Sequence, residues 1–133
     1  MNSPAERRRF HRFPFDAVGS IVRPGQPRVS CRIVDLSISG ALVTVEGRPG
    51  LVVGEEGELA MLITGELSGG EVELKIRFKV VRLDEDQLGC YFVGADPDNF
   101  DLLKRLVERN LGKPELLDRE LLQLGYWPGL QAQ

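Results

Sequence analysis

The chain has 133 residues, a formal net charge of −3 and a pI of about 5.2. This length predicts one domain, and a hydrophobic fraction of 42% is enough to fill its core. A protein that wraps long nucleic acid is usually basic, so the acidic balance argues against DNA or RNA as partner. Apolar runs stay well below the ~18 residues of a membrane helix, which predicts no membrane insertion.

Two arginines at positions 8 and 9 superficially resemble an export signal. An export signal continues into an apolar segment of about 7–15 residues, and residues 12–24 contain no such segment. We therefore expect a cytoplasmic protein.

Cys31 and Cys90 lie in apolar runs, which predicts two buried thiols rather than a disulfide framework. The acidic run 84–86 has no histidine or cysteine beside it and predicts a solvated turn, not a metal site.

Six short apolar runs, separated by turn signals, predict β-strands. The fifth has strict alternation of apolar and charged residues, which is typical of a strand with one buried and one solvated face. Gly89 within the sixth run predicts a bulge or close packing. The expected strands are 16–23, 28–36, 41–46, 57–64, 72–80 and 87–94. Without helices between them, they predict a mainly β fold, a closed six-stranded antiparallel barrel.

Helices are expected after the barrel. Asp96 suits an N-cap, Pro97 suits the first helical position, and Gly112 suits the end of that helix. Residues 114–124 predict a second helical segment, which Gly125 ends. The chain is thus expected to comprise a flexible arm (1–12), a barrel (16–95) and C-terminal helices (96–125) within a single domain, 1–133.

Four arginines give the N-terminal arm its chemistry: Arg7, Arg8, Arg9 and Arg12. A guanidinium is planar and permanently charged, and its paired donors fit phosphate and the O6/N7 edge of guanine. The following Phe13-Pro14-Phe15 stretch is expected to anchor the arm to the barrel.

The turn Asp35-Leu36-Ser37-Ile38-Ser39-Gly40 offers complementary groups. The Asp35 carboxylate can accept from the N–H groups of guanine, the Ser37 hydroxyl can donate or accept, and Gly40 is expected to take positive φ. Arm and turn together suit a small, flat, doubly charged anion that contains guanine and phosphate.

These two motifs, in this order on this pattern of strands, resemble the PilZ domain family of bacterial receptors for cyclic di-GMP. The family pattern is Arg-x-x-x-Arg followed by Asp/Asn-x-Ser-x-x-Gly, and positions 8–12 and 35–40 match it. The resemblance implies a ligand on the outer surface of the barrel, clamped by the arm. Carried over, it implies that Arg8 and Arg12 contact phosphate and guanine, that Asp35 and Ser37 bond a guanine, and that Gly40 keeps the turn close.

The resemblance leaves some positions open. Arg7 and Arg9 are additional charges, and Arg7 stands where it could help to hold a stacked pair of ligands. Some relatives place an aromatic residue near the end of the fifth strand, where this chain has Val80, Val81 and Arg82. Arg82 is either a partial substitute through a cation–π contact or simply an exposed arginine.

The leading functional prediction is a non-enzymatic receptor with no cofactor and no metal, which binds cyclic di-GMP and signals to an unidentified protein effector. The alternatives are a PilZ-like adaptor that binds protein but no nucleotide, and a module for single-stranded nucleic acid. With one histidine and no pairing of nucleophile and base, an enzyme has the least support. Affinity, ligand stoichiometry, oligomeric state and the regulated process stay open.

Overall fold

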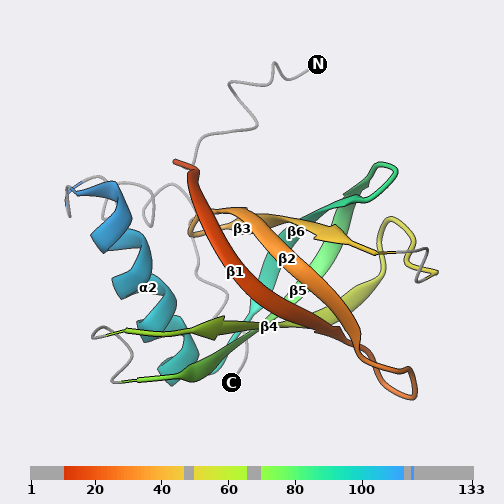
Figure 1. Cartoon of the computed structure of the whole chain (residues 1–133), viewed down its shortest axis with the longest axis horizontal. Helices are drawn as coiled ribbons and strands as arrows, with labels where there is room; N and C mark the ends of the chain where they lie inside the picture. The colour runs from red at the N-terminus through yellow and green to blue at the C-terminus, as the bar shows by residue number, and fades with distance from the viewer. Residues whose placement is uncertain (1–10, 47–49, 66–69, 113–114, 116–133) are drawn as a thin grey trace.

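A computed structural model of the chain describes residues 11–46, 50–65, 70–112 and 115. The elements are β1 (Phe13–Val22), β2 (Val29–Leu36), β3 (Gly40–Val45), β4 (Glu56–Ile63), β5 (Val72–Leu83), β6 (Gln87–Gly94) and α2 (Pro97–Leu111) (Figure 1). All six predicted strands are confirmed, with β1 starting three residues earlier and β5 ending three residues later than expected. The predicted arm, up to residue 10, and the segment 114–124, apart from residue 115, lie outside the described residues.

The strands close into a barrel in the order β1-β2-β3-β6-β5-β4, with every neighbouring pair antiparallel. Alternate residues point inward, so Leu74, Ile76 and Phe78 of β5 are fully buried while the charged residues between them face solvent. Burying one such side chain contributes about 1.5–3 kcal/mol. The mainly β prediction is therefore confirmed, and its physical basis is the two-residue period.

Helix α2 packs beside the barrel, against β5 (Figure 1). The Asp96 carboxylate accepts from the Asn99 N–H at 2.9 Å, and Gly112 ends the helix with φ of 73°. The face with Leu103, Leu106 and Val107 is buried. The Lys75 N–H donates to Asn99 Oδ1 at 2.8 Å, so the first turn of the helix is bonded directly to β5. The predicted cap and stop are confirmed.

Four register shifts interrupt the described strands: one lies between Arg77 and Phe78 of β5, and the other three are bulges that bear on the predicted site or on Gly89. The three bulges lie in β1 between Pro14 and Ala17, in β2 between Ile33 and Asp35, and in β5 between Val80 and Arg82. The third faces Gly89, where an added Cβ would lie 3.2 Å from the Arg82 Cβ. The bulge or close packing predicted at Gly89 is confirmed. A bulge redirects side chains, and two of these three lie around the predicted site.

Cys31 and Cys90 are buried free thiols, as expected. Burial raises the pKa of Cys31 to about 11. Burial raises the pKa of Cys90 as well, and the neighbouring Cys31 adds to that rise. A raised pKa lowers the thiolate fraction at neutral pH, and the thiolate is the reactive form.

We therefore predict that neither thiol of the native protein reacts readily with iodoacetamide or a disulfide reagent at neutral pH. Both thiols of each chain should react once urea unfolds the barrel. Thiol titration with and without urea measures this difference. Fast, stoichiometric modification of the native protein would contradict the burial of the pair.

Candidate ligand-binding site

The start of β1 lies beside the end of β2. Phe13 pairs with Leu36 and Pro14 pairs with Asp35, so Arg12 leads into the barrel at the level of the Asp35–Gly40 turn. The described part of the arm is exposed at Arg12. Phe13 is buried, and its ring meets that of Phe15 edge to face with centroids 6.2 Å apart. Two aromatic side chains thus fix the point from which the arm departs, while Arg7, Arg8 and Arg9 lie outside the described residues.

The β2 bulge places Asp35 on the outer side of the barrel. Ile33 and Leu36 both belong to the core, whereas Asp35 between them does not. The Asp35 Oδ1 atom is buried and has no hydrogen-bond partner among the described residues. A buried acceptor without a donor costs about 1–3 kcal/mol, and an acceptor on a charged group costs more. An unpaired carboxylate oxygen at the surface end of a strand is suited to receive a donor from a ligand.

Ser37 is engaged within its own turn. Its side chain is buried, and its Oγ accepts from the N–H groups of Ser39 and Gly40, each at 3.2 Å. The backbone closes the same turn, because the Ser37 N–H donates to the Gly40 carbonyl at 2.9 Å. The Ser39 hydroxyl, 3.2 Å from Ser37 Oγ, is less buried. The visible role of Ser37 is to shape the turn, and its contact with a guanine stays a prediction.

Gly40 is required for a different reason from the one predicted. Among the described glycines, six others have positive φ but Gly40 does not, so the expectation of a left-handed conformation is wrong. Gly40 starts β3 opposite Tyr91 of β6, and an added Cβ would overlap the carbonyl oxygen of Cys90. The close approach of two strands, rather than backbone handedness, selects glycine here.

Cross-strand pairing extends the site over the outer face of β3, β6 and β5. Asp35 pairs with Leu42, Leu42 with Gly89, and Gly89 with Arg82. Arg82 is an exposed residue whose Nε lies 3.2 Å from Asp84 Oδ2, so the reading as an exposed arginine fits the structure.

A second cross-strand row joins Gly40, Tyr91 and Lys79. Leu42, Tyr91 and Lys79 were not singled out from the sequence. The alternation within each strand predicts that these residues face outward, but it does not predict which strands are neighbours.

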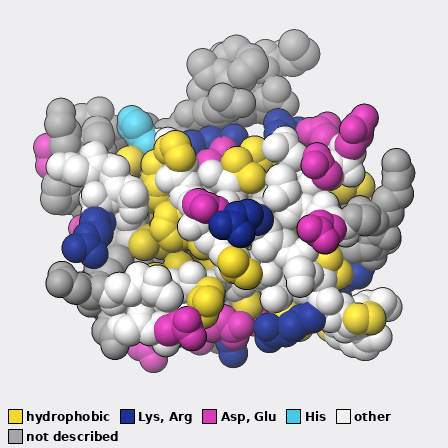
Figure 2. Space-filling model, in the orientation of Figure 1, with side chains coloured by type: hydrophobic (Ala, Val, Ile, Leu, Met, Phe, Trp, Pro, Cys, Tyr) yellow, Lys and Arg dark blue, Asp and Glu magenta, His cyan; other side chains and the backbone are white. Residues whose placement is uncertain are grey.

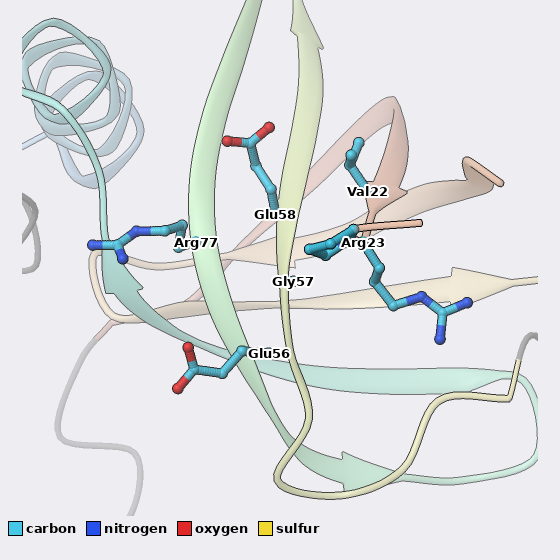
Figure 3. Close-up of a pocket in the computed structure, with 7 residues that line it drawn as sticks. Val22, Arg23, Glu56, Gly57, Glu58 and Arg77 are labelled. Atoms are coloured by element: carbon cyan, nitrogen blue, oxygen red, sulfur yellow. The ribbon is translucent and has the colours of Figure 1, made fainter. Parts of the chain in front are cut away.

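A hollow of about 410 Å³ lies at the other end of β1, lined by Val22, Arg23, Pro24, Glu56, Gly57, Glu58 and Arg77. It contains none of the predicted site residues. In Figure 3 the side chains of Glu56 and Arg77 extend to one side of the strands and that of Arg23 to the other. Side chains that diverge in this way do not form a convergent ligand site.

The described residues contain no group of three or more His, Cys, Asp or Glu side chains arranged to hold a metal ion. Within the same residues, no helix has the length and apolar character that a membrane span requires. Acidic and basic side chains are interspersed on the face that Figure 2 shows, and they form no continuous basic surface there.

The architecture is a closed six-stranded antiparallel barrel in which Arg12 leads into β1 beside the Asp-x-Ser-x-x-Gly turn. The family model described as PilZ domain matches residues 6–109, which is most of the sequence. The chain belongs to the PilZ domain family.

Solved structures share the fold. The PilZ domain of CeSA from a cellulose-synthesizing bacterium is 20% identical, with a TM-score of 0.58 over 73% of this chain and 94% of that one. The PilZ domain of YcgR from Escherichia coli, with c-di-GMP, is 18% identical, with a TM-score of 0.62 over 88% and 98%. The Bacillus subtilis inhibitor of motility MotI/DgrA is 16% identical, with a TM-score of 0.64 over 85% of this chain but only 57% of its own. At these identities the likeness establishes the fold alone.

The hydrogen bonds of Ser37 predict that Ser37→Ala destabilises the protein. The substitution leaves the N–H groups of Ser39 and Gly40 without their buried acceptor, at a cost of about 1–3 kcal/mol in the free energy of unfolding. Urea denaturation measures the loss. Ser39→Ala, which removes only the less buried hydroxyl, is the matched control and should cost less than about 0.5 kcal/mol. Equal effects would contradict the structural role of Ser37.

Proposed function

We propose that the protein is a receptor for cyclic di-GMP, bound on the outer face of the barrel between the arginine arm and the Asp35–Gly40 turn. The observation that carries the proposal is the Asp35 Oδ1 atom, which is buried and receives no donor from the described residues where Arg12 joins the barrel. The Watson–Crick edge of guanine presents N–H donors, which suit this oxygen. The guanine O6/N7 edge and the phosphates require donors of the kind that arginine supplies.

The proposed binding residues are Arg7, Arg8, Arg9, Arg12, Asp35, Ser37 and Gly40. Arg12, just before β1, and Asp35, near the end of β2, would both contact the ligand on the outer face of the barrel. Ser37 and Gly40 would act by holding the turn in shape. The family supports this assignment, because the PilZ domain of Escherichia coli YcgR has a structure with c-di-GMP. The stoichiometry, one molecule or a stacked pair, is left to measurement.

In this proposal the protein is a cytoplasmic, single-domain, non-enzymatic receptor, with neither DNA nor RNA as partner. Binding would order the arm over the ligand, and an ordered arm changes the surface that a partner meets. Output would pass to a protein effector. The bonds of Ser37 favour one alternative, because they explain the second motif as a turn device without any ligand. An adaptor that binds protein but no nucleotide would keep the motif for that reason.

Calorimetric titration with cyclic di-GMP separates these possibilities. Arg8→Ala and Arg12→Ala should each lose about 1–3 kcal/mol of binding free energy or more, as expected for a bidentate arginine contact. Arg28→Ala is the control, because Arg28 is an exposed arginine that pairs with Glu73 and directly precedes β2, at the opposite end of that strand from Asp35. Saturable binding by the intact chain and the control, with loss in both arm variants, supports the receptor. Absence of binding by the intact chain would favour the adaptor.

Asp35→Ala should separate stability from binding. The substitution removes a buried oxygen that has no partner among the described residues, so the free energy of unfolding should stay unchanged or rise by about 1 kcal/mol. The same variant should lose at least about tenfold in affinity for cyclic di-GMP. Urea denaturation and calorimetry of one preparation give both values. A clear loss of stability would mean that Asp35 serves the fold and not the ligand.

A further inference from the structure

Four exposed apolar residues lie on two segments that meet, the turn before β4 and the end of β5. Val52, Val53, Val81 and Leu83 are exposed to 59%, 62%, 54% and 42%. We call these four residues the valine patch. Single exposed apolar residues are ordinary, but a group brought together from two distant segments requires an explanation.

Backbone bonds hold the two segments together. The Gly54 N–H donates to the Val80 carbonyl and the Val80 N–H donates to the Glu55 carbonyl, both at 2.8 Å. The turn itself is closed by the Glu55 N–H, which donates to the Val52 carbonyl at 3.1 Å. The Glu55 carboxylate in turn pairs with the buried Arg23 at 3.2 Å. The patch is therefore a fixed surface before any partner arrives.

The β5 bulge explains why Val81 and Arg82 are both exposed. Alternation would place one of Val81 and Arg82 in the core, yet both are exposed because the register shifts between Val80 and Arg82. Gly89 opposite them offers no side chain, and a Cβ there would lie within 3.7 Å of Val81 Cγ2. Bulges often redirect a side chain for a purpose at the surface.

Charge around the patch indicates what covers it. Leu83 leads directly into Asp84, Glu85 and Asp86, all exposed, and Arg82 pairs with Asp84. This acidic rim, residues 84–86, repels an anionic membrane. It also opposes a symmetric pair of copies, because a two-fold axis through the patch would bring two acidic hairpins together. It complements a protein surface with an apolar centre and lysines or arginines around it.

We propose that the valine patch docks a protein partner of this kind, an apolar segment flanked by basic residues. The patch borders the candidate ligand site, because Arg82 lies in the same cross-strand row as Asp35. A bound cyclic dinucleotide adds two phosphate charges beside an acidic rim, so the ligand strengthens the docking of a basic partner. This ligand dependence rests on the proposed function, whereas docking itself does not.

The test uses the full chain and two amphipathic peptides of about 15 residues, a length at which helices begin to form. The peptides share their leucines and differ only in carrying lysine or glutamate on the polar face. Methyl NMR follows each titration, with and without cyclic di-GMP. The lysine peptide should shift the methyl signals of the valine patch in a saturable, salt-sensitive manner, and bind more tightly when the nucleotide is present.

Paired substitutions give the control. Val53→Ser with Val81→Ser should weaken the lysine peptide at least about tenfold. Val18→Ser with Val34→Ser, which alters two other exposed valines of the barrel, should leave it unchanged. Urea denaturation confirms that both variants fold. Equal weakening in the two pairs, or equal binding of the glutamate peptide, overturns the proposal.

Two other occupants have distinct signatures. Patch signals that move with protein concentration alone would assign the surface to a second copy. Patch signals that move on deletion of residues 1–10, without any peptide, would assign it to the arm of the same chain. Either result overturns a basic partner. If cyclic di-GMP fails to bind, the receptor proposal falls, while the titration without nucleotide still decides whether the valine patch docks the peptide.

Discussion

The site depends on the pairing of β1 with β2, because this pairing brings two distant motifs to one place. Phe13 lies opposite Leu36 and Pro14 opposite Asp35. In an antiparallel pair a shift of one residue would exchange the faces of the strand and bury the polar groups. The core residues Ile33 and Leu36 prevent that shift, and the bulge between Ile33 and Asp35 allows the carboxylate to face outward without breaking the ladder.

Two neighbouring polar residues are treated in opposite ways. The Ser37 hydroxyl is used fully by the turn, whereas Asp35 keeps a buried oxygen without a partner. A fold gains stability from the first arrangement and loses some from the second. Proteins commonly accept such a loss at sites of function. Ser37 therefore shapes the turn, whereas Asp35 leaves an acceptor available at the candidate site.

The candidate site and the valine patch share one sheet surface. Gly89 lies between them, and its missing side chain leaves room for the β5 bulge that exposes Val81 and Arg82. Closed barrels have no free strand edge, so a partner must meet the outer face. In the proposed receptor, ligand and partner would lie side by side on one sheet, and no large movement would be needed to couple them. Electrostatic complementarity would carry that coupling.

The sequence alone determined the mainly β fold, the six strands, the capped helix and both motifs. These follow from local rules, since apolar periodicity, turn residues and capping act within a few neighbours. Tertiary structure decided the rest. Which strands lie side by side decides why position 40 must be glycine and which residues share a cross-strand row with Asp35, such as Leu42 and Arg82. The tertiary structure also decides that the Ser37 hydroxyl is bonded within its turn and that the Asp35 Oδ1 atom has no partner among the described residues. The order of the strands comes from closure of the barrel, a constraint between residues far apart in the chain, which local patterns do not carry.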